Sequence, residues 1–123
     1  MIFDGAHNPQ GIDSAVESIK HYFGDKKVYI LTGVLKDKDY EYIASRLSLV
    51  ASRAFVLTPN SPRALASSEY AAVLQKYGVK ALGYDTLTEA YENAKQCAAE
   101  RGNALVCLGS LYTYEELMSI IEK

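Results

Sequence analysis

The stretch from Met1 to Gly11, MIFDGAHNPQG, joins a short apolar run to an acid, a glycine, a histidine and Asn-Pro. Met1–Phe3 has the composition of a buried strand. Pro9 suits the first position of a helix, where a missing backbone N–H costs nothing. The stretch therefore predicts a strand that leads through a tight turn into a helix, which is the repeating unit of α/β folds.

The same alternation continues along the chain. The other continuous apolar runs, typical of strands covered on both faces, are Val28–Leu31, Ala54–Thr58, roughly Val79–Leu82, and Ala104–Leu108. Stripes of apolar residues at helical spacing lie between them, within Ile12–Phe23, Tyr40–Leu47, Tyr70–Tyr77, Leu87–Ala98 and Tyr114–Ile121. We expect residues 1–123 to form a single three-layer, Rossmann-like α/β domain, with a mostly parallel sheet and helices on both faces.

The residues at the expected helix ends agree with this pattern. Gly24, Gly78 and Gly102 follow apolar stripes, at positions where a positive φ is often needed. Thr86 and Thr113 each precede a glutamate by three residues, the spacing of a capping box.

Composition excludes several classes of protein. The net charge is −2 and the pI is about 5.7, so no basic surface is expected to hold nucleic acid or an anionic membrane. No apolar run approaches the roughly 20 residues that span a bilayer. Cys97 and Cys107 lack CxxC or Cys/His spacing, so we expect no metal site and interpret both as small core residues in a reducing cytoplasm.

Chemistry is expected where the parallel strands end, because open α/β sheets bind ligands outside the carboxyl ends of their strands. The loops that share this edge are Asp4–Asn8, Thr32–Lys38, Thr58–Arg63, Tyr84–Thr86 and Gly109–Thr113. The GxxxxGK[ST], GxGxxG and GxSxG patterns are all absent from the sequence. A self-sufficient P-loop enzyme, a dinucleotide-dependent dehydrogenase and a serine hydrolase are therefore disfavoured.

Two interpretations fit the loop after the first strand. Asp4 can accept hydrogen bonds from a ribose or an adenine amino group, and His7 can donate to an anionic substrate or intermediate. Alternatively, Asn8 caps the helix, Gly5 makes the turn and Asp4 stabilises the helix dipole. The second interpretation leaves His7 unexplained.

Other residues at this edge also allow two interpretations. Arg63, directly after Pro62, presents a planar guanidinium suited to a carboxylate or phosphate, or is an ordinary surface arginine. Gly109 and Ser110 lie where a backbone can approach a ligand, or they form a turn before the Thr113 capping box.

The loop after the second strand, TGVLKDKDY, is rich in charge. Lys36 and Lys38 can meet anions or belong to a solvated charge cluster, and Asp37 or Asp39 can cap the next helix. His21, the second histidine, lies among polar neighbours on a helix and is interpreted as a surface residue.

Four motifs in this order resemble one family. FDGAHNPQG, TGVLKDKD, TPNSPRAL and GSLY are similar to the C-terminal domain of bacterial folylpolyglutamate synthase, often also dihydrofolate synthase, in the Mur ligase superfamily. The resemblance covers essentially the whole chain, and DGAHNP is its most specific part. It implies a cytoplasmic ATP-dependent ligase that phosphorylates an acid to an acyl phosphate, which the amine of glutamate then attacks.

The resemblance also implies roles for particular residues. Asp4 matches the aspartate that contacts ATP, whereas His7 and Ser110 match catalytic residues near the incoming glutamate. Arg63 lies in a motif similar to the Asn-Pro-Arg element that holds the amino-acid substrate, although Ser61 interrupts the spacing. The family uses ATP and Mg²⁺, and the magnesium ligands are expected outside this chain.

The sequence departs from the family by lacking the P-loop, the modified lysine and the upstream arginine. We therefore expect an excised C-terminal domain, inactive alone, whose partners are ATP, glutamate, a folate and the N-terminal ATPase domain. Two alternatives stay open: a related Mur-type ligase domain that uses another acid, and a stand-alone nucleotide-binding or interaction module. Neither the use of dihydropteroate nor the oligomeric state follows from the sequence.

Overall fold

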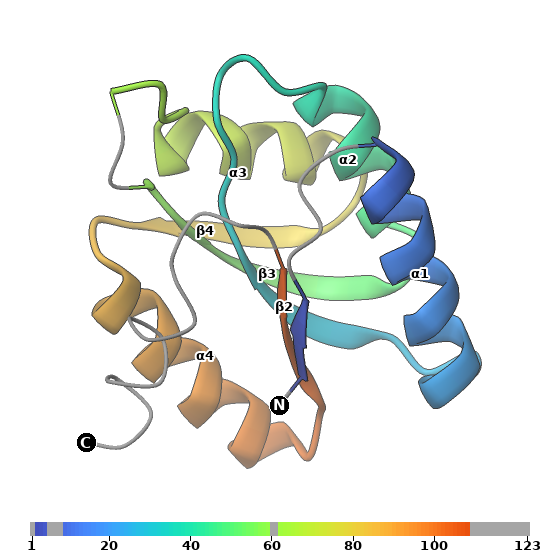
Figure 1. Ribbon diagram of the computed structural model, residues 1–123. Coiled ribbons are helices and arrows are strands. Elements are labelled where there is room, and N and C mark those ends of the chain that lie inside the picture. The colour runs from blue at the N-terminus through green and yellow to red at the C-terminus, as the bar shows by residue number, and fades with distance from the viewer. Residues whose placement is uncertain (1, 5–8, 60–61, 109–123) are drawn as a thin grey trace.

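Strands at the centre of the computed structural model are flanked by helices on both sides (Figure 1). The structure describes residues 2–4, 9–59 and 62–108, with residues 2–4, 9–11 and 108 described through their backbone alone. The strands are β1 (Ile2–Asp4), β2 (Val28–Thr32), β3 (Ala51–Leu57), β4 (Lys80–Tyr84) and β5 (Leu105–Leu108). The helices are α1 (Pro9–Phe23), α2 (Tyr40–Leu47), α3 (Ser67–Lys76) and α4 (Leu87–Arg101).

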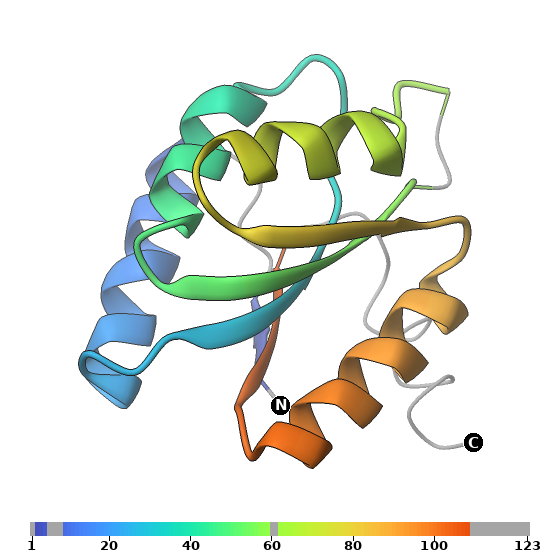
Figure 2. The same cartoon turned by 180° about the vertical axis from the view of Figure 1, so that it is seen from behind.

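The described sheet has the strand order β1-β5-β2-β3-β4, and every pair of neighbours in it is parallel. The chain moves in one direction across the sheet from β1 to β4 and then returns to place β5 between β1 and β2. Because crossovers between parallel strands are right-handed, the returning helix must lie on the opposite face. Accordingly α1, α2 and α3 cover one face and α4 covers the other (Figures 1 and 2).

Each face of the sheet has its own hydrophobic core, because successive strand residues point to opposite sides. Ile30 and Val56 pack with Leu74 and the rest of the three-helix side. Leu31 and Phe55 belong to the core beneath α4. This alternation explains why β2 is buried along its whole length, as the continuous apolar run predicted.

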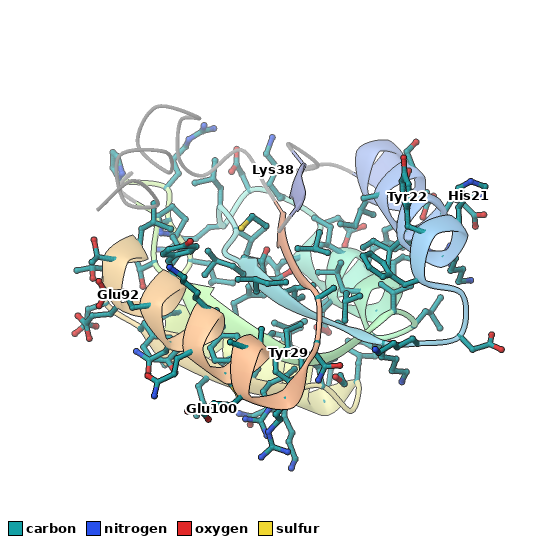
Figure 3. The ribbon with its side chains drawn as sticks, turned by 90° about the horizontal axis from the view of Figure 1, so that it is seen from below. His21, Tyr22, Tyr29, Lys38, Glu92 and Glu100 are labelled. Carbon is teal, nitrogen blue, oxygen red and sulfur yellow. The ribbon has the colours of Figure 1, made fainter. Side chains whose placement is uncertain are left out.

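The α4 side also contains both cysteines. Cys107 is fully buried, which confirms its interpretation as a core residue, whereas Cys97 is half-buried and accepts a 3.3 Å hydrogen bond from Nη1 of Arg53. The Arg53 guanidinium lies 5.6 Å from the centre of the Tyr29 ring. Figure 3 shows Tyr29, a residue of β2, beside α4, and Glu92 on the outer side of that helix.

The expected fold class, with its parallel sheet and helices on both faces, is confirmed. Two strand boundaries differ from the predictions by more than one residue. β3 begins at Ala51 rather than Ala54, because Ser52 and Arg53 interrupt the apolar run although they are only half-exposed in the sheet. β4 runs on to Tyr84 instead of ending at Leu82, since it continues to pair with β3 there.

The predicted helix ends are confirmed where the structure describes them. Gly24, Gly78 and Gly102 have φ values of 61°, 91° and 64°. The Thr86 hydroxyl accepts the backbone N–H of Glu89 at 3.2 Å, which satisfies one of the free donors at the start of α4.

Three further predictions fall on parts of the chain outside the described residues. These are the cap by Asn8, the capping box at Thr113 and the helix within Tyr114–Ile121. Among the helices that are described, none is long and apolar enough to cross a membrane.

Candidate functional site

The strand register brings the four sequence motifs to one edge of the sheet. Asp4 at the end of β1 pairs with Leu108 at the end of β5, so the chain enters DGAHNP and GSLY from neighbouring positions. Cys107 pairs with Leu31 of β2, which leads into TGVLKDKD. β3, the next strand, leads into TPNSPRAL. Motifs that are widely separated in sequence therefore leave the sheet from four adjacent strands.

The structure places the predicted site residues unequally. The backbone of Asp4 ends β1, one residue beyond the predicted strand, and its side chain lies outside what is described. His7 and Ser110 lie outside the described residues altogether, although each follows a strand that ends at this edge. Arg63 is described, with contacts to Asp37 and Lys36 among its interactions.

Two loops of this edge are fastened to each other through their backbones. Leu35, after β2, and Ala64, before α3, form an isolated antiparallel bridge. On one side of it the Lys36 N–H donates to the Arg63 carbonyl at 2.7 Å, and on the other the Leu65 N–H donates to the Val34 carbonyl at 3.0 Å. These bonds fix the two loops side by side, so that TGVLKDKD and TPNSPRAL form one surface.

An ion pair between the same loops adds a side-chain contact. Nη1 of Arg63 donates to Oδ2 of Asp37 at 2.7 Å, with side-chain exposures of 63% and 47%. The sequence left open whether Asp37 or Asp39 caps the next helix, and the structure assigns the cap to Asp39, which accepts the Tyr42 N–H at 3.3 Å. Asp37 is therefore the acid whose carboxylate contacts Arg63, a role that sequence reasoning missed.

The start of α3 is held from two strands of the sheet. Its first residue, Ser67, donates its backbone N–H to Oγ1 of Thr58 at 2.9 Å. This contact replaces a side-chain cap, since Ala66 at the N-cap has none to offer. Gly83 of β4 lies so close that a Cβ there would be 2.8 Å from Oγ of Ser67 and 3.0 Å from the Ser68 nitrogen. The position of α3 relative to the edge is thus set by both β3 and β4.

A three-residue cluster joins α1 to α2. The Tyr42 hydroxyl donates to the Asp13 carboxylate at 2.7 Å, and Nε of Arg46 donates to the same carboxylate at 2.9 Å. The hydrogen bond to Asp13 raises the pKa of the Tyr42 hydroxyl, because losing the proton would leave two negative charges in contact. The cluster orients the helix that follows DGAHNP.

A separate groove of about 510 Å³ lies away from this edge. Its lining includes Arg53 near the start of β3, Gly78 and Val79 before β4, and the exposed Leu82. None of the four motifs lines it within the described residues. We therefore assign the candidate site to the carboxyl edge rather than to this groove.

Two other observations bear on sequence predictions. Among the described residues, no group of three or more His, Cys, Asp or Glu side chains could hold a metal ion. His21 is exposed on α1 beside Tyr22, as expected for a surface residue (Figure 3).

With this arrangement in view, comparison with known proteins identifies the family. Residues 1–111 match the family model described as "Mur ligase, glutamate ligase domain". The chain belongs to this family. The matched residues include all five described strands, together with the positions of Asp4, His7, Arg63 and Ser110.

Individual relatives of the Mur ligase domain agree with this assignment. The folylpolyglutamate synthase of Lacticaseibacillus casei is 36% identical over 74 residues, which cover 59% of this chain and 17% of that protein. The folylpolyglutamate synthase of Mycobacterium tuberculosis, in crystal structures complexed with ADP and AMPPCP, superposes with a TM-score of 0.84 at 24% identity. That match covers 98% of this chain and 29% of the other, and it shows the shared fold.

A second structure of the mycobacterial enzyme, complexed with ADP, matches at 25% identity and a TM-score of 0.79, over 98% of this chain and 29% of its own. The chain therefore spans less than a third of the length of each of these relatives.

Proposed function

We propose that this chain works as the C-terminal domain of a longer ATP-dependent ligase that adds glutamate to folates. The main support for this proposal is the strand register. It places the ends of four adjacent strands at one edge of the sheet, and these strands lead into DGAHNP, GSLY, TGVLKDKD and TPNSPRAL. Relatives named folylpolyglutamate synthase, one of them in complex with ADP, support the substrate class. The length of these relatives supports a further part that carries the P-loop.

The proposed reaction has two steps. The γ-phosphoryl group of ATP passes to the folate carboxylate, which forms an acyl phosphate and releases ADP. The amine of glutamate then attacks the acyl carbon, phosphate leaves, and the amine loses a proton as the amide forms. Both steps depend on positioning and on stabilising negative charge, which polar groups on rigid loops can supply.

In this scheme the residues at this edge of the sheet have different roles. Asp4 contacts ATP, while His7 and Ser110 orient glutamate and stabilise charge at the acyl centre. Arg63 binds a carboxylate of glutamate, a role supported by its charge and its place on the fastened loops. Mg²⁺ would shield the phosphate charges, and we assign its ligands to the rest of the enzyme. Closure of this domain over the ATPase part would complete the site.

The test is steady-state ligation by the full-length enzyme with ATP, a folate and glutamate. We expect His7→Ala to lower kcat/KM about 100-fold or more, as loss of a charge-stabilising donor does. The matched control is His21→Ala, which removes the other histidine from an exposed helical position and should leave kcat/KM unchanged.

Arg63→Ala tests the carboxylate site. We expect the KM for glutamate to rise about 10- to 100-fold, the usual effect of losing a charge-assisted hydrogen bond. Arg101→Ala, at the exposed far end of α4, is the control and should not change this KM. Near-normal ligation by the His7→Ala enzyme would disprove the catalytic assignment, and an unchanged glutamate KM in Arg63→Ala would disprove the carboxylate site.

A further inference from the structure

The ion pair between Asp37 and Arg63 joins loops that are already fixed by other contacts. The backbone bonds on either side of the Leu35–Ala64 bridge hold the two loops together without it. Both side chains are substantially exposed, and exposed ion pairs contribute little to folding stability. The ion pair therefore contributes little to holding the two loops together.

The chemistry of the contact points to another role. Oδ2 of Asp37 accepts a charge-assisted hydrogen bond of 2.7 Å from Nη1 of Arg63. A carboxylate of an incoming amino acid would accept the same kind of bond from the same guanidinium. The guanidinium has further N–H donors, but a carboxylate that approaches it must either displace Asp37 from Nη1 or lie beside the Asp37 negative charge, which repels it.

From this geometry we infer that Asp37 is an internal competitor that lowers the affinity of Arg63 for the substrate carboxylate. The inference rests on the proposed role of Arg63 in binding glutamate. Asp37 thereby sets the glutamate concentration at which the site fills, and keeps the guanidinium paired until a carboxylate replaces it. Weak competition is expected, because the pair is exposed and its strength is limited by water.

The competing hypothesis predicts the opposite sign. If Asp37 mainly orients the Arg63 side chain for its ligand, then removing the Asp37 charge would disorder the guanidinium and weaken binding. The sign of the change in glutamate KM therefore separates competition from orientation.

The experiment measures glutamate KM and kcat for the full-length enzyme carrying Asp37→Asn. We expect the KM to fall about two- to fivefold, the range set by an exposed ion pair, with kcat unchanged. Asp37→Glu, which keeps the carboxylate, should retain a KM near that of the parent enzyme. Asp25→Asn, in the exposed turn before β2, makes the same change in net charge and should have no effect.

A double variant shows whether the effect passes through Arg63. In the Arg63→Ala background, Asp37→Asn should no longer lower the KM, because the competitor has lost its target. A similar fall in that background would mean a general charge effect and would overturn the inference. An unchanged or raised KM in the single Asp37→Asn variant would overturn it as well.

The outcome for the proposed function remains separate. If Arg63→Ala leaves the glutamate KM unchanged, the carboxylate site itself is wrong. If Arg63→Ala raises the KM but Asp37→Asn does not lower it, only the competition is wrong. The glutamate KM of Asp37→Ser, a second variant without the carboxylate, should fall as it does in Asp37→Asn. Thermal unfolding of every variant shows whether the fold is retained.

Discussion

The two ends of the sheet are built in different ways. At the amino end of the strands, short turns are closed by their own backbone: the Gly78 N–H donates to the Gln75 carbonyl, and the Asn103 N–H donates to the Ala98 carbonyl. At the carboxyl end, the two longer loops after β2 and β3 are fastened to one another through the Leu35–Ala64 bridge, beside which Asp37 pairs with Arg63.

The difference shows that the two ends of the sheet have different roles: the amino-end turns reverse the chain, and the carboxyl-end loops carry the candidate site. Three of the amino-end turns place a glycine at positive φ, at Gly24, Gly78 and Gly102, and the turn between α2 and β3 has no glycine. The carboxyl-end loops hold acidic, basic and hydroxyl side chains in fixed positions, which a binding site requires. Substitutions at the carboxyl end should therefore affect both stability and ligand binding, whereas those at the amino end should affect stability alone.

The largest expected effect follows from Gly83→Ala. The new Cβ would approach the Ser67 hydroxyl and the backbone of Ser67 and Ser68 to within 2.8–3.0 Å, so the first turn of α3 must shift. We expect a loss of about 2–3 kcal/mol in the free energy of unfolding, measured by urea denaturation. Under the proposed function, the glutamate KM of the longer enzyme should also rise, because the loop carrying Arg63 leads into α3.

Gly102→Ala is the amino-end control for that variant. Its φ of 64° strains an L-residue, but a Cβ there meets nothing within 4 Å. We expect a loss of about 1 kcal/mol in stability and no change in glutamate KM. Equal effects of the two substitutions on KM would contradict the difference drawn between the two ends.

Tyr70→Phe should act in the opposite direction. The Tyr70 hydroxyl is fully buried and has no hydrogen-bond partner among the residues that the structure describes. Removing it leaves the ring in place and abolishes the desolvation cost, so we expect stability to rise by about 1 kcal/mol in urea unfolding. A clear fall in stability would mean that the hydroxyl is hydrogen-bonded after all. Tyr70→Leu, which also removes the ring, should destabilise the chain.

The smallest effect concerns the α1–α2 cluster and appears only at high pH. Folding raises the pKa of the Tyr42 hydroxyl above its usual value of 10.0. The neutral hydroxyl therefore makes its full contribution to the free energy of unfolding below pH 10. That contribution is lost as the pH rises through the raised pKa. Tyr42→Phe should therefore show a weaker fall in stability above pH 10 than the parent chain, measured by thermal unfolding.

Tyr22→Phe provides the control for this pH series, because Tyr22 is 73% exposed on α1. Its pH profile should follow that of the parent. If both variants show the same profile, the hydrogen bond to Asp13 contributes nothing to the alkaline loss.

The sequence predicted the architecture well because strand and helix periodicity are local signals. β2 was predicted nearly to its ends, since its residues are all buried and all except Thr32 are hydrophobic. The start of β3 was not, because Arg53 is polar and fits into the sheet only by contacting Tyr29 and Cys97, which come from other elements. Such contacts depend on packing that periodicity does not contain.

The candidate site was predicted in part, for a related reason. Placing the four loops at one edge required only the rule for parallel sheets. The partner of Arg63 was missed because Asp37 is 26 residues away, and their contact depends on the register of β2 against β3. The roles of His7 and Ser110 remain predictions.

The position of β5 has a consequence for how the protein is made. In the described sheet β5 separates β1 from β2, so β1 gains its neighbour only when Leu105–Leu108 has left the ribosome. Among the described strands, β1 is thus synthesised first but is the last to be paired in the sheet. A nascent chain that stalls before β5 can pair β2, β3 and β4 but leaves the backbone of Asp4 without its strand partner, so this edge of the sheet is completed only after β5 has been translated.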